Sequence, residues 1–294
     1  MSKWLMSALL CAPFSVTASS VDWFQNNTSL VQAHQHLLER DLSSLFTSLV
    51  ETWQQKHNAI VESNLNDLLI QSLDMDCGKG LESAQTPAWI KSVIVRRSDI
   101  QSPRRDNFRA SIEIHTTKEI ANVTLTKWVD SVISANDEAL LDSSSLSTND
   151  NEKVYIKRYN LNNPLPIGLY RLNVVTKDNT SWNSWVVLSD AKAKYSVRWT
   201  AKDKWKIEKN ALLNKHCPLP KLNVSLYDYE GGSYHMVWSK MYESGYPESL
   251  AAVNLPPDRY ILAVSMTHQR WQGPILVERT QIISKNYEIS GDDE

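Results

Sequence analysis

A ten-residue motif that occurs twice in the second half of the chain is the strongest constraint on the fold. Residues 165–174 read Leu-Pro-Ile-Gly-Leu-Tyr-Arg-Leu-Asn-Val, and residues 255–264 read Leu-Pro-Pro-Asp-Arg-Tyr-Ile-Leu-Ala-Val. In each copy a proline-containing turn leads into an apolar strand, and the tyrosine hydroxyl is expected to bond back to the turn, as in a tyrosine corner. The copies start 90 residues apart, which is about the length of one immunoglobulin-like sandwich. The repeat therefore predicts two tandem immunoglobulin-like β-sandwiches.

Tryptophans at related positions extend the repeat. Trp182 and Trp271 follow the two motif tyrosines, and Trp128 and Trp238 precede them on the strands expected to cross the centre of each sandwich. Eleven Trp against only eight Gly suit sheets with broad aromatic cores. We therefore expect residues 92–190 and 195–290 to superpose, with Tyr170 on Tyr260.

The first part of the mature chain has a helical rather than a strand period. Residues 27–76 carry apolar side chains three and four positions apart, with Thr28 and Asp41 as candidate N-caps and Gly78 as a candidate stop. The segment around Ala33 to Phe46 is similar to a tetratricopeptide hairpin. The predicted fold class is multidomain α+β, with a tetratricopeptide-like helical module before the two sandwiches. The predicted boundaries are 1–18 for a signal peptide, 19–86 for the helical module, 87–190 for sandwich 1 and 191–290 for sandwich 2.

The N-terminus has the three parts of a secretory signal peptide. Lys3 supplies the positive charge, residues 4–12 are apolar, and Val16-Thr17-Ala18 offers small side chains for the peptidase. The apolar run is about half of the roughly 20 residues that a membrane-spanning helix needs. We expect cleavage after Ala18, a mature chain without a transmembrane segment, and a periplasmic or secreted location.

Two cysteines remain after cleavage at that site. Cys77 and Cys217 form an isolated even pair, which in an oxidising compartment favours a disulfide bond. Two unrelated buried thiols are the alternative. A metal site has less support, because no Cys-x-x-Cys or Cys/His cluster accompanies either residue.

Sequence patterns for catalysis are missing. The chain has no Gly-x-Ser-x-Gly, His-Glu-x-x-His or phosphate-binding glycine loop. The His34-x-His36 spacing sends the two rings to different faces of a helix, and Asp74-x-Asp76 lacks the further oxygen ligands of a calcium loop. We therefore predict no enzyme activity, no catalytic residues, no metal and no cofactor. The net charge of −2 also argues against nucleic acid as a partner.

Two basic segments are candidates for binding. Arginines cluster where the first sandwich is expected to start: Arg96, Arg97, Arg104, Arg105 and Arg109. They could hold phosphate or carboxylate groups in bidentate fashion, or they could be a solvated strand edge that blocks aggregation. Residues 192–215 interleave lysines and an arginine with Tyr195, Trp199 and Trp205. This pattern suits either an anionic glycan or the alternation of an amphipathic strand that packs its rings in the core.

The mature N-terminal region resembles an uncharacterised family of exported proteins from Vibrio-type gamma-proteobacteria. The resemblance rests on Val21-Asp22-Trp23-Phe24, on residues 37–42 and 49–54, and on Asp76-Cys77-Gly78, and it extends over essentially the whole chain. Some members of that family look like companions of two-component systems that control envelope stress. The resemblance implies an accessory role in the envelope and assigns no catalytic residue.

These observations predict a non-enzymatic periplasmic or secreted accessory protein that binds an envelope protein, such as the periplasmic domain of a sensor kinase. Helical hairpins and sheet edges are both common recognition surfaces. The alternative is a lectin-like module for cell-wall or capsular glycan. Exposed tryptophans on a concave face would favour the glycan, and buried tryptophans would favour the protein partner.

Overall fold

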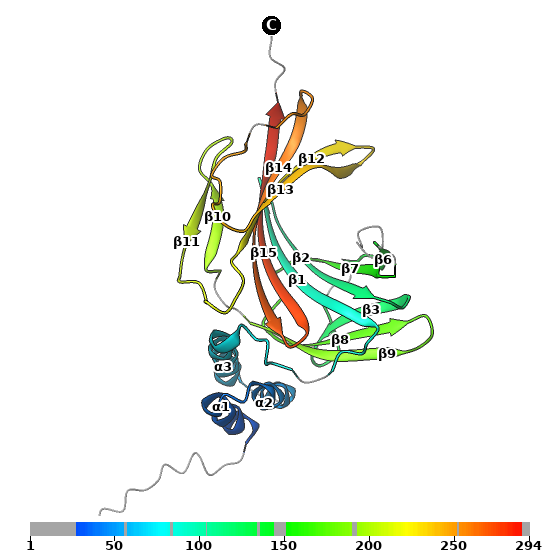
Figure 1. The fold of residues 1–294 in the computed structure, drawn as a ribbon, viewed down its shortest axis with the longest axis vertical. Coiled ribbons are helices and arrows are strands. Elements are labelled where there is room, and N and C mark those ends of the chain that lie inside the picture. Colours follow the sequence, from blue (N-terminus) through cyan, green and yellow to red (C-terminus); the bar gives the residue numbers. More distant parts are fainter. Residues whose placement is uncertain are drawn as a thin grey trace, which may run out of the picture.

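The computed structural model describes residues 28–55, 58–82, 85–103, 105–133, 136–143, 151–189, 193–251 and 253–289. Most of them lie in strands, and a long curled sheet dominates the molecule, with three helices packed at one end (Figure 1). The predicted signal peptide, residues 1–18, lies outside the described residues. No helix in the described part of the chain is both long and apolar enough to cross a membrane.

The helical period predicted for residues 27–76 is confirmed. The three helices are α1 (Ser29–Glu39), α2 (Leu42–Gln54) and α3 (Ala59–Asp76). Thr28 and Asp41 cap the first two, because their side-chain oxygens accept hydrogen bonds from the backbone amides of Val31 (3.4 Å) and Ser44 (3.1 Å). Each cap satisfies an amide that has no partner within its helix, so the local sequence sets where the helices begin.

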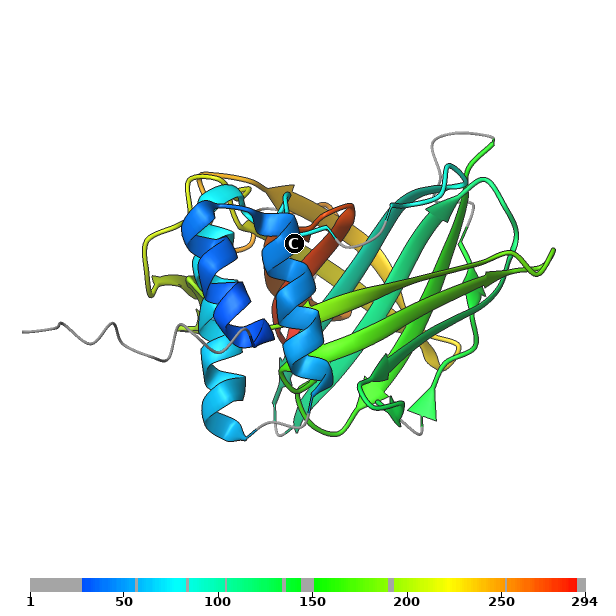
Figure 2. The ribbon, with the colours of Figure 1, turned by 90° about the horizontal axis from the view of Figure 1, so that it is seen from below.

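The prediction of a tetratricopeptide-like module is wrong. Leu45, Leu49 and Leu69 from the helices share one hydrophobic core with Leu169 and Val187, which belong to a β-sheet. The helices therefore lie across the outer face of that sheet (Figure 2). A helical hairpin cannot bury its apolar face alone, and here a sheet rather than a second repeat covers it.

The strands form three sheets. The largest has nine strands: β13 (Ser233–Tyr242), β12 (Lys221–Glu230), β14 (Asp258–Gln272), β15 (Ile275–Ile289), β1 (Ile90–Ser102), β2 (Arg105–Thr116), β7 (Lys153–Leu161) and β5 (Asn136–Asp137) in this order, with β6 (Leu141–Asp142) also on β7. A four-stranded sheet has the order β4 (Ser131–Val132), β3 (Ile120–Lys127), β8 (Gly168–Thr176), β9 (Ser181–Leu188). A two-stranded ribbon pairs β10 (Tyr195–Trp199) with β11 (Trp205–Lys209).

The prediction of two tandem immunoglobulin-like sandwiches is wrong. β1 pairs in parallel with β15, so that Val95 lies beside Val277, and the same β1 pairs on its other side with β2. One sheet therefore runs through both halves of the chain. The 15-residue strand β15 links the two ends of this sheet, because Ile275 and Val277 share a core with the four-stranded sheet and Ile283 shares a core with the β10–β11 ribbon. The predicted domain boundaries stay predictions.

The tyrosine corners are nevertheless present. The hydroxyl of Tyr170 donates to the carbonyl oxygen of Pro166 at 2.6 Å, and that of Tyr260 donates to the carbonyl oxygen of Pro256 at 2.8 Å. The two motifs occupy different sheets, since Tyr170 begins β8 of the four-stranded sheet and Tyr260 begins β14 of the nine-stranded sheet. The motif thus specifies how a strand begins and leaves open which sheet the strand joins.

Candidate functional site

The predicted disulfide between Cys77 and Cys217 is confirmed, with Cα atoms 5.1 Å apart and a sequence separation of 140. Cys77 is the C-cap of α3. Its carbonyl oxygen accepts a hydrogen bond from the amide of Trp271 at 2.9 Å, and the carbonyl oxygen of Gly78 accepts one from the amide of Gly273 at 3.0 Å. The end of α3 is therefore fixed both to the loop that carries Cys217 and to the β14–β15 turn.

Gly78 makes this close approach possible. Its φ of 86° lies in the left-handed region that favours glycine. A Cβ atom at this position would lie 2.1 Å from the backbone oxygen of Trp271. Any larger residue would push the end of α3 away from β14 and shift one wall of the cavity that lies beside it.

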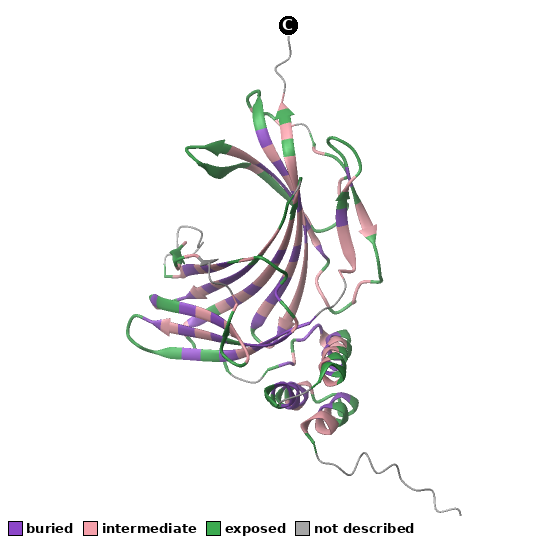
Figure 3. Ribbon diagram, turned by 180° about the vertical axis from the view of Figure 1, so that it is seen from behind, coloured by how far each residue is buried: buried purple, intermediate pink, exposed green. Residues whose placement is uncertain are grey.

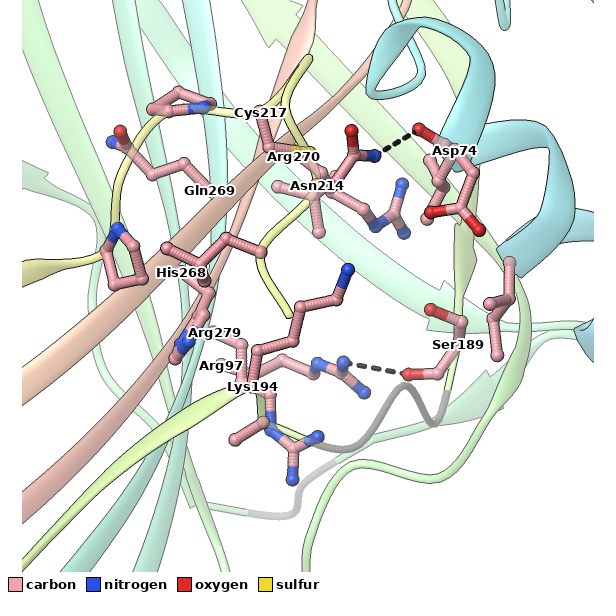
Figure 4. A pocket seen from close by; sticks show the side chains of 17 residues that line it. Asp74, Arg97, Ser189, Lys194, Asn214, Cys217, His268, Gln269, Arg270 and Arg279 are labelled. Carbon is pink, nitrogen blue, oxygen red and sulfur yellow. Dashed lines mark hydrogen bonds between the residues drawn. The ribbon is translucent and has the colours of Figure 1, made fainter. Parts of the chain in front are cut away.

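That cavity has a volume of about 140 Å³ and lies between α3, the disulfide loop and the nine-stranded sheet (Figure 4). α3 and the disulfide loop contribute apolar groups, among them Leu73, Leu213 and Pro218. The opposite wall is basic, with Arg97 on β1, Arg270 on β14, Arg279 on β15, and Lys194 just before β10. Asn214 ties the disulfide loop to α3, because its Nδ2 donates to the carbonyl oxygen of Leu73 at 2.7 Å.

The strand register places the three arginines on one face. Arg97 is the cross-strand partner of Arg279, and Arg279 is in turn the partner of His268, two positions before Arg270. Paired residues and residues two apart on a strand point to the same side of a sheet. Like charges are thereby collected on one side of the sheet, where α3 and the disulfide loop cover them.

Backbone carbonyls hold two of these guanidinium groups in place. Arg97 Nη2 donates to the carbonyl oxygen of Ser189 at 2.9 Å, and Arg270 Nη2 donates to that of Val187 at 2.6 Å. Arg279 Nη2 lies 3.7 Å from a carboxylate oxygen of Asp99. A neutral carbonyl orients a guanidinium through a hydrogen bond and does not itself carry a neutralising charge.

Burial and mutual repulsion perturb the titration of the site. Burial, with a further contribution from the charge of Arg97, lowers the pKa of Arg270 to about 9. Burial, with the charges of Arg279 and Lys194, lowers the pKa of His268 to about 4. His268 is therefore neutral at pH 7. Its Nε2 accepts the amide hydrogen of Tyr195 at 3.1 Å, so the neutral ring carries its proton on Nδ1, which is a hydrogen-bond donor.

The structure places the described arginines of the predicted cluster differently, and Arg97 and Arg109 line one further pocket. Arg96 and Arg97 are neighbours on a strand and face opposite sides; Arg96 Nε lies 2.5 Å from a carboxylate oxygen of Glu278. Arg105, at the start of β2, is exposed, and Arg109 is exposed and donates to Asn160 Oδ1 at 3.2 Å. Arg104 lies outside the described residues. Of the described arginines in the cluster, only Arg97 lines the cavity under the disulfide.

The predicted basic-aromatic segment packs its rings inward. Trp205 is 1% exposed, and Trp199 is half-buried with its ring 6.1 Å from that of Trp205, centroid to centroid. The ammonium of Lys285 lies 3.9 Å from the centroid of the Trp199 ring, which is a close cation–π contact. The structure therefore agrees with amphipathic alternation of Tyr195, Val197 and Trp199, and Val197 is buried in the same core.

Sequence reasoning did not single out Arg270, Arg279 and His268. The available signal was an ionisable side chain at alternate positions of a strand, as in His268-x-Arg270. Such a pattern is also typical of a solvated strand face. The disulfide loop that covers these residues could not be placed over them from the sequence.

A second candidate surface is the hairpin of β12 and β13, which projects from the sheet (Figure 1) and is largely exposed (Figure 3). The strands are joined by Gly231 and Gly232, whose φ values of 60° and 88° fit a two-residue type I′ turn. Large apolar side chains of the hairpin are exposed: Tyr229, Tyr234, Met236, Val237 and Met241. Val237 is the extra residue of a bulge, since Leu226 pairs with Trp238 and Tyr227 with Met236.

A family model described as "Protein of unknown function (DUF2861)" matches residues 23–288. No curated protein matches the chain.

Proposed function

Because the chain belongs to this family of proteins of unknown function, its role has to be inferred from its surfaces, and we propose that it is a non-enzymatic accessory protein that binds a protein partner through the β12–β13 hairpin. The observation that carries the proposal is the exposed apolar edge strand β13. Large apolar patches on a protein surface mark interaction sites.

The backbone of β13 supports strand addition. β13 is the last strand at its end of the nine-stranded sheet and pairs only with β12 in the described part of the chain. Its outer row of amide and carbonyl groups can accept an extended segment of another protein. Natural edge strands are protected against pairing by charges, proline, bulges or brevity. β13 has ten residues, a single lysine, Lys240, and one bulge at Val237, so most of its length is unprotected.

The side chains of the hairpin suit a protein interface. Tyrosine and methionine are enriched at the centre of such interfaces, and Tyr234 and Met236 are 62% and 58% exposed. The rings of Tyr229 and Tyr234 contact each other with centroids 4.8 Å apart and planes tilted by 49°, so they form a preformed aromatic surface. Preformed side chains lose less conformational entropy on binding.

An envelope protein, such as the periplasmic domain of a sensor kinase, is the partner that we propose. This step rests on the signal-like sequence of residues 1–18 and on the implied accessory role. A lectin-like function has less support, because Trp182 and Trp205 are buried, and Trp185, Trp199 and Trp271 are half-buried. Sugar-stacking sites need accessible ring faces.

The experiment places a photo-crosslinking amino acid at Tyr234 in living cells. We expect one discrete adduct with an envelope protein, identified by mass spectrometry, and no adduct from the same label at Leu212, which is 91% exposed outside the hairpin. The identified protein, once purified, should bind the wild-type chain saturably. Met236→Lys should weaken binding by tenfold or more, and the matched control Leu212→Lys should leave it unchanged.

Two results would overturn the proposal. Equal binding by the Met236→Lys and wild-type chains would show that the hairpin is not the contact surface. Saturable binding to purified cell-wall or capsular glycan that is lost in Trp199→Ala, without any protein adduct, would favour the lectin alternative.

A further inference from the structure

We propose that the segment of the partner that docks on the β12–β13 hairpin is an extended acidic strand, which pairs with residues 238–242 of β13 and places one carboxylate opposite Lys240. This inference rests on the proposed function, because it concerns the same hairpin, and it adds the chemistry and the position of the contact. Four features carry it: the other sheet edges, the support behind β13, the two faces of β13 and its charge.

Two other strand edges are closed by glutamine side chains. β9 ends the four-stranded sheet, and Gln272 Oε1 accepts the amide hydrogen of Val187 in that strand at 2.9 Å. In β10, Gln281 Oε1 accepts the amide hydrogen of Val197 at 2.9 Å, and Gln281 Nε2 donates to the carbonyl oxygen of the same residue at 3.0 Å. Among the described residues, no side chain bonds to the backbone of residues 238–242. The edge of β13 is therefore available for an added strand, unlike those of β9 and β10.

The half of β13 nearest the sheet is the better supported half. Residues 238–242 pair with residues 222–226 of β12, and residues 221–227 of β12 pair on their other side with β14. Beyond Tyr227 the described hairpin consists of two strands, and an isolated two-stranded hairpin is marginally stable. A strand that is already held in place loses less conformational entropy when it receives a partner. This favours residues 238–242 over the tip of the hairpin.

A bulge gives β13 one apolar face. Met236 and Met241 are five positions apart, so in a regular strand they would point to opposite sides. Because Val237 is the extra residue of the bulge, both methionines lie on the same side, where they pair with Tyr227 and Asn223. They are 58% and 60% exposed. Large apolar side chains at alternate positions of an added strand would cover them.

Charge sets the register of the added strand. Lys240 lies on the other side of β13 from the methionines and pairs with Val224. It is exposed, its ammonium lies 5.3 Å from the centroid of the Tyr242 ring, and no carboxylate of the described residues pairs with it. Asp228 and Glu230 lie on the same side of the hairpin, nearer the tip. A carboxylate of the partner is therefore attracted at Lys240 and repelled toward the tip.

Synthetic peptides of defined sequence test this chemistry in calorimetric titrations of the full oxidised protein. The acidic probe is acetyl-Thr-Val-Thr-Val-Glu-Val-Thr-Val-Thr-amide, which alternates apolar and polar positions. In the basic probe a lysine replaces the glutamate, and in the scrambled probe the same residues stand in an order that breaks the alternation. We expect the acidic probe to bind saturably and at least tenfold more tightly than either comparison peptide.

Charge exchange locates the contact. Lys240→Glu should weaken binding of the acidic probe tenfold or more and strengthen binding of the basic probe, so that the preference reverses. Lys240→Gln should abolish the preference without reversing it. Lys206→Glu, the same exchange at an exposed lysine of β11, should leave the preference unchanged. Binding of the acidic probe should also slow amide hydrogen exchange at alternate residues of 238–242, because an added strand bonds every second amide of an edge.

Four results would overturn this inference. They are no binding of the acidic probe, equal binding of the acidic and basic probes, equal effects of Lys240→Glu and Lys206→Glu, and unchanged exchange at residues 238–242. A specific photo-adduct at Tyr234 together with any of them would keep the hairpin as the contact surface and remove only the acidic strand. Binding of the probes as expected without any photo-adduct would instead remove the envelope partner and keep the site for an acidic strand.

Discussion

At the scale of single residues, His268 shows how a basic pocket is kept stable. The ring is neutral at pH 7 because burial, Arg279 and Lys194 lower its pKa to about 4. Protonation would add a further cation to the group that already contains Arg97 and Arg270. The neutral ring can donate from Nδ1 without adding to that charge.

This arrangement predicts acid sensitivity. Between about pH 6.5 and pH 4 the unfolded chain binds a proton at His268 and the folded chain does not. The contribution of His268 to the free energy of unfolding should therefore be fully present above pH 6.5 and be lost as the pH falls through 4. Urea unfolding at a series of pH values should show a shallower decline in His268→Gln, whose amide oxygen can still accept the Tyr195 amide.

His115 provides the control because its pKa shift has the opposite direction from that of His268. Burial lowers its pKa, but hydrogen bonds and charges from Glu113 and Glu152 outweigh burial and raise the pKa above 6.5 overall. Its stabilising contribution is present below pH 6.5 and is lost as the pH rises through the raised pKa. His115→Gln should change the stability profile on the alkaline side. An acid limb that is the same in wild type and His268→Gln would contradict the assignment.

At the scale of strands, the two tyrosine corners predict similar losses from different sheets. Tyr170→Phe and Tyr260→Phe each remove a hydroxyl that satisfies a proline carbonyl. Each should lower the free energy of unfolding by about 1–2 kcal/mol, measured by urea denaturation. Tyr229→Phe, at a position 60% exposed, should change it by less than about 0.5 kcal/mol. Equal effects at all three positions would show that the corner bonds contribute little.

Elements specified by nearby residues were predictable, and pairings between distant strands were not. The caps at Thr28 and Asp41 and the tyrosine corners depend on contacts within a few residues, and the structure confirms them. The prediction of two sandwiches from the repeat is wrong because a local motif carries no information on which strands pair with each other. Nothing near Val95 in the sequence indicates that Val277 lies beside it.

The residues of the candidate pocket show the same difference between local contacts, which were predictable, and distant strand pairings, which were not. Its disulfide was predictable, because the expected cleavage after Ala18 would remove Cys11 and leave Cys77 and Cys217 as one possible intramolecular pair. Strand alternation places Arg96 and Arg97 on opposite faces of the sheet, and the run of arginines in the sequence does not show this separation. Arg270 and Arg279 join Arg97 only through the β14–β15 and β1–β15 registers, which long-range packing decides.

At the scale of the whole molecule, the disulfide ties the helices to the sheet. Cys77–Cys217 closes a loop with a sequence separation of 140, for which loop entropy gives a stabilisation of up to about 5 kcal/mol. Cys77→Ser with Cys217→Ser should therefore lower the urea midpoint clearly. Wild type in dithiothreitol should behave like the double variant, and the double variant should not respond to dithiothreitol. An unchanged midpoint in both cases would show that the bond adds no stability.

The parallel pairing of β1 with β15 also has a consequence for how the chain folds. These neighbours lie about 180 residues apart in the sequence and β15 is the last strand, so the sheet has a high contact order, which slows folding. β1, β2 and β7 can pair early, but the other edge of β1 stays open until residues 275–289 are available. The slowest productive step should therefore be the arrival of the C-terminal strand, and the open edge of β1 is the site at which incomplete chains would associate.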